Sequence, residues 1–468
     1  MSRKERRYQQ KLAQKEGARA GPAARPSEAT ALLIGRLQAQ AIAFQHAGRP
    51  HRALKICKDI LALRPVNPDV VLGYAGRLAL EIGDHGEAAA LYGRAAALRP
   101  DIAEVHYNFA GALSQLGRLD EAAGAYRTAL ALRPDFMPAH HNLGNVLRGL
   151  GRTEEAVEAY RRALAVEATA EGERDLGVAL SLLGQLDEAI AAWRRSLALP
   201  GHRTDLYSNL ANALLEQGDA AGALAACERW LALVPASIEG AALQALALNA
   251  LGDKQGARRL LDFDRFVRVI DFTAPPPGFA SLAAFNAALA EHVERHPTLK
   301  VPPRDQPTYH HDALQITDEL LSPPRGPMVA FETMMRRAVM NYAEGVPRQP
   351  PHPFPEHIPP RWHFGCWATR LLGEGNLEPH IHFTGYIGGV YYPLLPDVVK
   401  EEGRGEAGWF ELGRAPERLA CNAEPLTRRI QPREGRLILF PGYFFHATIP
   451  FTAPQQRISI AFDVMPTE

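Results

Sequence analysis

Cysteine is scarce in this chain, and the few cysteines present are far apart. Cys57, Cys227, Cys366 and Cys421 show no Cys-x-x-Cys spacing. Secreted proteins that depend on disulfides carry more cysteines at closer intervals. This usage predicts reduced thiols and a cytoplasmic protein.

Long hydrophobic runs and a net charge are also lacking. No apolar stretch of about 18 residues is free of charge or proline, so we expect no membrane span. Lysine plus arginine and aspartate plus glutamate number 52 each, which predicts no general attraction to nucleic acid or membranes. The exception is a basic tail at residues 1–29. It has no apolar segment of the kind that secretory signals carry, and we expect it to be disordered.

What the chain does contain is an internal repeat. Glycines recur every 33 to 35 residues, and an alanine follows each of them by five positions. The glycines are Gly48, Gly83, Gly117, Gly151, Gly184, Gly218 and Gly252. A proline closes most units, so each unit is predicted as a helix, a tight glycine turn, a second helix and a stop. The segment NLGNVLRGLGRTEEAVEAYRRAL (142–164) resembles the tetratricopeptide repeat. The resemblance implies a superhelix of about seven units over residues 30–265.

Asparagines recur in phase with these glycines. They are Asn108, Asn142, Asn145, Asn209 and Asn212. In the tetratricopeptide family these positions lie on the first helix of a unit and face the concave groove. An amide side chain offers a donor and an acceptor together, as a peptide backbone does. We therefore expect them to bind a protein or peptide, although helix packing at a common consensus position would explain them equally well.

The pattern changes after the array. Residues 266–360 are predicted as a helical connecting region, with a strand within 260–272 and helices at 281–296 and 327–343. Residues 361–468 read as short strands separated by turn signals. The predicted strands are 364–372, 388–395, 408–413, 435–441, 446–451 and 457–465. The expected fold class is therefore multi-domain α + β. It comprises an all-α repeat superhelix, an α/β linker region and a C-terminal double-stranded β-helix (jelly roll).

A set of histidines and one arginine gives this last region its chemistry. His380 and His382 are two residues apart, so on a strand or its exit they face the same way. His446, from a distant strand, supplies a third imidazole. Three protein ligands on one face leave open metal positions for a cosubstrate and oxygen. Arg457 and Ser459 share a face of the last predicted strand and suit a carboxylate, so a 2-oxo acid could bridge them to the metal.

Two aromatic features complete the predicted site. Tyr391 and Tyr392 alternate faces, so one of them can point inward to a cosubstrate, and we assign this role to Tyr392. The tryptophans Trp362, Trp367 and Trp409 are expected to pack in the core.

The stretches CWATRLLGEGNLEPHIHFTGYIGGVYYPLLP and REGRLILFPGYFFHATIPFTAPQQRISIAFDVMP resemble 2-oxoglutarate/iron(II) oxygenases that are fused to tetratricopeptide arrays. The resemblance implies iron(II) at His380, His382 and His446, and 2-oxoglutarate at Arg457 and Ser459. The best-known members have aspartate or glutamate where His382 stands. Glu378 is an alternative source of the carboxylate. Asp463 has an even spacing from Arg457, but a solvated or capping role is the expectation for it.

Three functions fit these observations. The first is an iron- and 2-oxoglutarate-dependent dioxygenase that hydroxylates a protein held by the repeats. The second is a non-enzymatic adaptor with a degenerate β-helix domain, and the third is a cupin-like metalloprotein acting on a small molecule. The phosphate-binding motif G-x-x-x-x-G-K-[ST] is missing, which argues against a nucleotide-dependent transferase. The intact Arg457-x-Ser459 pair favours the first function over the second.

Overall fold

The structure is a computed structural model that describes residues 27–302, 314–350, 352–383, 385–400, 405–419 and 423–467. Most of the basic tail lies outside the described residues. Contacts divide the chain into two compact units, Met1–His202 and Arg203–Glu468. Each unit is described by itself below.

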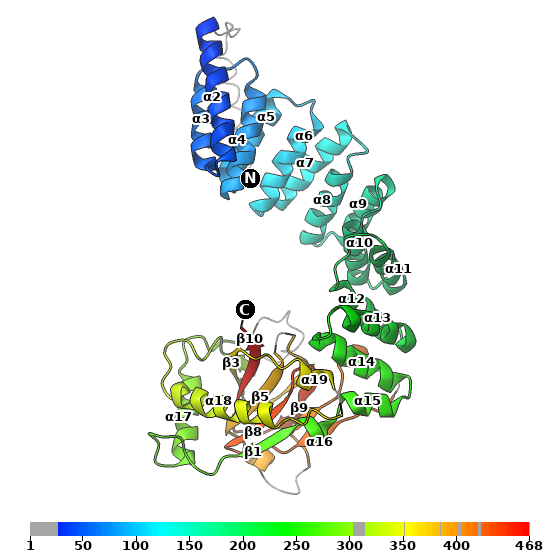
Figure 1. Cartoon of the computed structure of the whole chain (residues 1–468), viewed down its shortest axis with the longest axis vertical. Helices are drawn as coiled ribbons and strands as arrows, with labels where there is room; N and C mark the ends of the chain where they lie inside the picture. Colours follow the sequence, from blue (N-terminus) through cyan, green and yellow to red (C-terminus); the bar gives the residue numbers. More distant parts are fainter. Residues whose placement is uncertain are drawn as a thin grey trace. The chain divides into compact units, whose positions relative to one another are not determined.

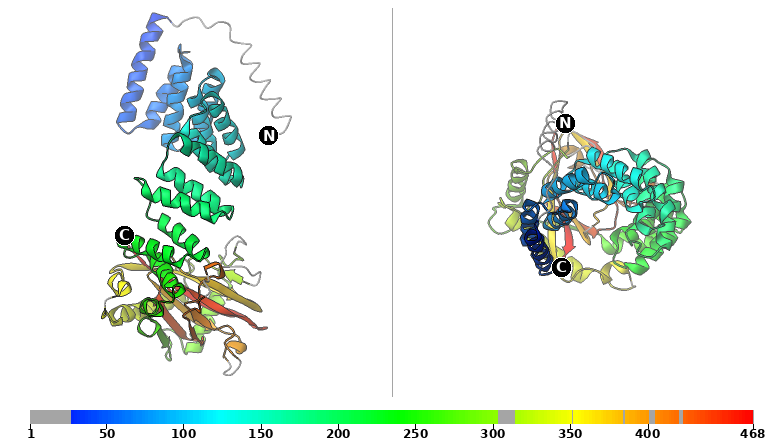
Figure 2. Two further views of the ribbon diagram at one scale, coloured as in Figure 1. Left: turned by 90° about the vertical axis from the view of Figure 1, so that its right-hand side faces the viewer. Right: turned by 90° about the horizontal axis from the view of Figure 1, so that it is seen from above.

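The first unit is built from antiparallel helix pairs. Its helices are α2 (Glu28–His46), α3 (Pro50–Ala62), α4 (Pro68–Ile82), α5 (His85–Leu98), α6 (Ala103–Gln115), α7 (Leu119–Leu132), α8 (Met137–Gly149), α9 (Thr153–Val166), α10 (Ala170–Leu182) and α11 (Leu186–Ala198). The pairs stack one after another (Figure 1) and follow a curved path when seen from above (Figure 2, right). This confirms the predicted all-α repeat architecture.

The repeat signature has a direct structural cause. All seven phase-setting glycines adopt positive φ angles, between 67° and 85°, at the turn within each helix pair. Residues with a Cβ rarely adopt that conformation. The seven following alanines are 0% exposed, because the paired helices approach closely there. These alanines are Ala53, Ala88, Ala122, Ala156, Ala189, Ala223 and Ala257.

The second unit begins with the last repeats. They form α12 (Leu206–Glu216), α13 (Ala220–Leu233), α14 (Ile238–Ala250) and α15 (Lys254–Leu260). The Asn249 side chain of α14 donates a hydrogen bond to the carbonyl of Glu424 in the β region. The Tyr386 hydroxyl donates to the carbonyl of Ala236, which precedes α14. The final repeat therefore packs on the domain that follows it.

Two antiparallel sheets form the jelly roll. The larger sheet has the order β1-β8-β5-β10-β3-β2, and the smaller has the order β4-β9-β6-β7. The strands of the larger sheet are β1 (Arg268–Asp271), β2 (Leu314–Ile316), β3 (Trp362–Leu371), β5 (Ile387–Leu394), β8 (Arg436–Pro441) and β10 (Arg457–Pro466). Those of the smaller sheet are β4 (Glu374–His380), β6 (Phe410–Leu412), β7 (Arg428–Ile430) and β9 (His446–Thr452). This arrangement confirms the predicted jelly roll.

Helices cover the outer face of the larger sheet. These are α17 (Leu282–Glu294) and α18 (Met328–Gly345), and α18 crosses the strands in Figure 1. The Phe331 ring of α18 packs edge-on against Tyr391 and Phe462. The Tyr391 hydroxyl donates to Asn286 of α17 over 2.6 Å. Because Tyr391 faces these helices, Tyr392 faces the opposite side, the interior of the roll.

The connecting region differs from the prediction in detail. The strand predicted within 260–272 is shorter, because α16 (Phe263–Phe266) precedes β1. The predicted helices α17 and α18 are present, and the Ser281 hydroxyl caps α17 by accepting a hydrogen bond from the Ala284 N–H. Short helices are also present at α19 (Pro353–Glu356), α20 (Asp397–Lys400) and η1 (Glu417–Leu419). Within the described residues, no helix has the length and apolar character to cross a membrane.

Candidate metal centre and cosubstrate pocket

The structure brings three histidines together between the two sheets. His380 ends β4, His382 follows it by two residues, and His446 begins β9, paired directly with His380. Their ring centroids lie 4.3 to 5.2 Å apart. One nitrogen from each ring falls within 4.8 Å of the others. The group has the size and composition of a three-histidine metal site.

Each imidazole is held in one orientation by its Nδ1 atom. The Nδ1 atoms of His380 and His446 lie 2.7 and 3.1 Å from the carbonyl oxygens of Glu378 and Phe444. A carbonyl oxygen only accepts, so these Nδ1 atoms carry the proton and Nε2 keeps its lone pair. A hydrogen bond of this kind, from the nitrogen that does not bind the metal, fixes the tautomer of a metal-binding histidine.

The surroundings keep the rings of His380 and His446 neutral. Burial lowers the pKa of His380 to about 3 and holds the pKa of His446 well below its ordinary value. Phe440 and Phe410 pack against His446, with ring centroids 4.9 and 5.8 Å away. Neutral imidazole is the form that binds a metal ion, so His380 and His446 do not have to lose protons near pH 7.

Asp463 is the residue that the sequence interpretation misjudged. It is 4% exposed, and its Oδ1 accepts a hydrogen bond from Nδ1 of His382 over 2.7 Å. It is therefore neither solvated nor a cap. A Cβ at position 385 would lie 2.4 Å from the Asp463 carboxyl carbon, so Gly385 leaves the room that this carboxylate occupies. The even spacing from Arg457 was the signal for its orientation.

Two other expectations need correction. Trp367 lines the site rather than the core, and its ring meets His382 edge-on with centroids 5.0 Å apart. Glu378 does not join the metal group, because its carboxylate accepts a hydrogen bond from Asn376 over 2.7 Å. Within the part of the chain that the structure describes, Asp463 is the only carboxylate hydrogen-bonded to one of these imidazoles, that of His382.

A narrow cavity of about 40 Å³ runs from the histidines into the roll. Arg457, Ser459 and Tyr392 line it, together with Thr369 of the neighbouring strand. The structure thus brings together all six residues that the sequence analysis assigned to metal and cosubstrate.

Arg457 lacks a counter-ion. It is 1% exposed, its Nε atom has no hydrogen-bond partner, and no salt bridge reaches it within the described residues. Its Nη1 lies 3.5 Å from the Ser459 hydroxyl, and its guanidinium lies 5.2 Å from the centre of the Tyr392 ring. Burial holds the pKa of Arg457 below its usual value. A buried charge without a partner is costly, so the pocket fits a ligand carboxylate.

The Tyr392 hydroxyl is a second buried polar group without a partner in the described chain. Burial raises its pKa to about 12, so it remains a donor at neutral pH. A hydroxyl donor beside an unpaired guanidinium forms a cradle for an anionic oxygen. The donor set fits a 2-oxo dicarboxylic acid whose far carboxylate meets Arg457.

The asparagines of the repeats differ in exposure. Asn108 and Asn209 are exposed, and the structure gives them no hydrogen bond. Asn142 donates to the Tyr107 hydroxyl, Asn145 accepts from the Tyr160 hydroxyl, and Asn212 donates to Glu239. The last three therefore have part of their hydrogen-bonding capacity used within the array.

Comparison with known families agrees with this architecture of helical repeats and a jelly roll. Residues 365–463 match the family described as "Putative 2OG-Fe(II) oxygenase". Residues 112–151, 138–169 and 174–238 match tetratricopeptide repeat families. The chain therefore combines tetratricopeptide repeats with a C-terminal domain of that oxygenase family, which implies iron(II) and 2-oxoglutarate as cofactors. No curated protein matches the chain.

Solved structures with similarity to the chain include repeat proteins. YrrB, described as a tetratricopeptide protein with an unusual peptide-binding site, is 23% identical, with 38% of this chain and 93% of that chain covered and a TM-score of 0.35. A tetratricopeptide repeat protein from Parabacteroides merdae is 20% identical, with 49% and 91% covered and a TM-score of 0.39. MamA from Desulfovibrio magneticus is 18% identical, with 36% and 94% covered and a TM-score of 0.34.

Proposed function

We propose that this protein is an iron(II)- and 2-oxoglutarate-dependent dioxygenase that hydroxylates a protein or peptide held by its repeats. The observation that supports this proposal is a single cavity lined by three oriented imidazoles and by a buried arginine without a counter-ion in the described chain. In this proposal the repeat array covers residues 30–265, a connecting region covers 266–360 and the catalytic domain covers 361–468.

Iron(II) and 2-oxoglutarate, when bound, would let dioxygen hydroxylate the substrate: one oxygen atom enters the substrate C–H bond as a hydroxyl group, and the other oxidises 2-oxoglutarate to succinate and carbon dioxide. His380, His382 and His446 hold the metal through Nε2, since their Nδ1 atoms are engaged. Arg457, Ser459 and Tyr392 hold the far carboxylate of 2-oxoglutarate and so fix its orientation. Phe410 and Phe440 exclude water from the side of His446.

Asp463 supplies the negative charge that a third histidine ligand lacks. In this proposal it is a positioning residue, since its carboxylate polarises and orients His382 through the 2.7 Å hydrogen bond. The resembling oxygenases place that carboxylate directly on the metal. In this chain the imidazole of His382 would lie between the metal ion and the Asp463 carboxylate.

Asp463→Asn should therefore weaken metal binding about 10- to 100-fold while retaining a hydrogen-bond acceptor of the same shape. Metal titration of the apoprotein under anaerobic conditions measures the effect. The change His382→Asp supplies a carboxylate ligand directly, so in that background Asp463→Asn should cost little. Equal losses in both backgrounds would mean that Asp463 acts through the fold and not through His382.

The experiment that tests the function follows turnover of 2-oxoglutarate without a protein substrate. We expect slow, iron-dependent formation of succinate, measured by mass spectrometry against a metal-free control. Iron binding without consumption of 2-oxoglutarate would favour a cupin-like metalloprotein. Absence of iron binding would favour the adaptor function.

In the same assay, the double variant Asn108→Ala/Asn142→Ala should keep this turnover, because these residues lie in the first unit. Each lost amide contact costs roughly 1 kcal/mol, so partner binding should weaken about thirtyfold. Crosslinking and mass spectrometry of captured partners measure that loss. Asn67→Ala is a matched control, since Asn67 is exposed between α3 and α4 and its side chain caps neither helix. Equal capture by all three proteins would contradict peptide binding at these asparagines.

A further inference from the structure

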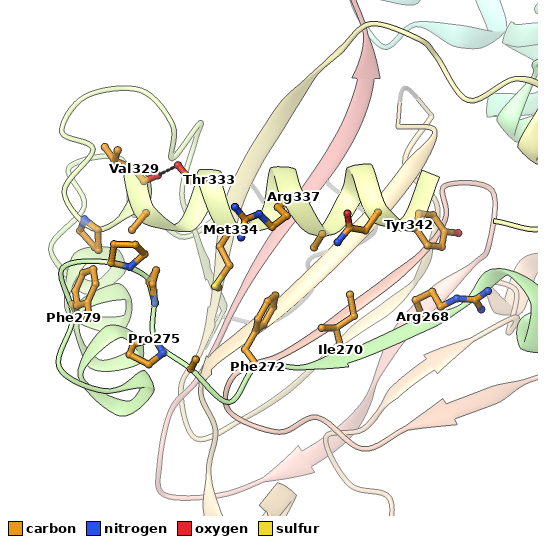
Figure 3. Close-up of a pocket in the computed structure, with 18 of the residues that line it drawn as sticks. Arg268, Ile270, Phe272, Pro275, Phe279, Val329, Thr333, Met334, Arg337 and Tyr342 are labelled. Carbon is orange, nitrogen blue, oxygen red and sulfur yellow. Dashed lines mark hydrogen bonds between the residues drawn. The ribbon is translucent and has the colours of Figure 1, made fainter. Parts of the chain in front are cut away.

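A second cavity lies on the outer face of the jelly roll, away from the histidines. It is a groove of about 1000 Å³ between α18 and β1. In Figure 3 the Met334 side chain descends from α18 towards Phe272, which directly follows β1, and the Ile270 side chain rises from β1 towards the same helix. Pro275 and Phe279 lie at one end, and Arg268 and Tyr342 at the other. The lining shares no residue with the metal centre or its cosubstrate pocket.

The groove combines an apolar lining with unneutralised positive charge. Among the described residues, no aspartate or glutamate lines it, whereas Arg268 and Arg337 do. Arg337 is exposed and makes no hydrogen bond or salt bridge within the residues that the structure describes. Arg268 donates only to the main-chain carbonyls of Asp264 and Val267. The neighbouring Arg336, by contrast, is paired with Glu332. An apolar occupant that carries carboxylates would complement this lining.

The floor of the groove is the terminal strand of its sheet. β1 pairs with β8 on one side only, and no other described strand joins it. The Phe272 N–H donates to the Gly435 carbonyl, so the alternate residues Arg268 and Ile270 also direct their main-chain groups towards β8. The main-chain groups of Val269 and Asp271 point away from β8. Their N–H and C=O groups are therefore free to pair with another extended chain.

We propose that this groove docks an extended peptide segment that adds to β1 as a further strand and presents apolar and acidic side chains together on one face, at every second position. Main-chain hydrogen bonds to Val269 and Asp271 give the affinity, as in other complexes formed by strand addition. Apolar side chains enter between Phe272 and Met334, and carboxylates meet Arg268 and Arg337. The free strand edge favours a peptide over a single-chain carboxylic acid, which has no use for it.

Selection from a displayed library of random dodecapeptides tests this docking site on the full chain. The library is first depleted on the variant Arg268→Glu/Arg337→Glu, so that peptides bound by the repeats are removed. Circular dichroism establishes that this variant is folded. Peptides then selected on the unaltered protein should carry aspartate or glutamate two or four residues from valine, isoleucine, leucine or phenylalanine, so that both kinds of side chain share one face of the strand.

The selected peptides should bind Arg337→Gln about tenfold more weakly in fluorescence polarisation. Arg295→Gln is the matched control, because Arg295 is an exposed arginine on the nearby region of chain after α17 and does not line the groove. It should bind the peptides as the unaltered protein does. A peptide copy with alternate N-methylated amides should fail, and the unmodified peptide should slow hydrogen exchange at Val269 and Asp271.

Three outcomes would overturn the proposal. The selected peptides could show no acidic enrichment, or they could bind Arg337→Gln with unchanged affinity. Alternatively, sodium laurate could bind in an Arg337-dependent manner while no peptide is recovered, which would make the groove a site for lipid carboxylates. Because the metal centre is not involved, each outcome can be read independently of 2-oxoglutarate turnover.

Discussion

His446→Ala is expected to lose nearly all bound iron(II). His446 is buried, and it supplies the only ligand from the strand opposite His380 and His382. Its neighbours Phe410 and Phe440 offer no replacement donor atom. Two remaining imidazoles would leave the metal held mainly by water. Anaerobic reconstitution with iron(II), desalting and elemental analysis measure the loss.

Two further variants make this result interpretable. His446→Gln keeps most of the side-chain volume and should also lose iron, which separates loss of a ligand from loss of packing. His363→Ala removes an exposed histidine of β3 that does not line the cavity, and it should retain full stoichiometry. Full iron content in both His446 variants would contradict the proposed ligand set.

The repeats could be predicted from sequence because their cause is local. A glycine at positive φ and an alanine with no exposed surface are required at fixed distances along the chain, so the requirement is visible as a period. The strands were also predicted largely in place. β4 was missed because Gly375 and Pro379 interrupt its pattern, and its pairing with β9 is irregular. β7 has only three residues and leaves no readable alternation.

The site was predictable in its residue types but not in its surroundings. His380 and His382, like Arg457 and Ser459, are two residues apart, and residues at that spacing on a strand share one face. Each pair could therefore be recognised from the sequence alone. The contact between His382 and Asp463 joins residues 81 positions apart, and it depends on how β10 lies beside the exit of β4. The same limit applies to Trp367 and to the groove beside β1. These features depend on which strands are neighbours in the sheets, and local sequence patterns do not reveal that order.

The burial of the Arg457 guanidinium is energetically unfavourable, and this cost indicates the role of the residue. Its guanidinium is buried without a counter-ion in the described chain, and such a charge destabilises the fold. A structural arginine would have a carboxylate partner, as Arg436 has in Asp271. Arg457→Met should therefore leave the thermal unfolding midpoint of the cosubstrate-free protein unchanged or higher. Loss of a structural contact would lower it.

Arg457→Ala should in turn weaken 2-oxoglutarate binding by about 2–5 kcal/mol, which is a loss of roughly 30-fold to several thousand-fold. Calorimetry with iron(II) present under anaerobic conditions measures the affinity. Added 2-oxoglutarate should raise the unfolding midpoint of the unaltered protein but not that of the variant. Arg370→Ala is the control, because Arg370 bonds Gln456 and Gln315 and does not line the cavity. If Arg457→Ala binds 2-oxoglutarate as tightly as Arg370→Ala does, the cosubstrate carboxylate has another partner, and the buried guanidinium needs a different ligand to explain it.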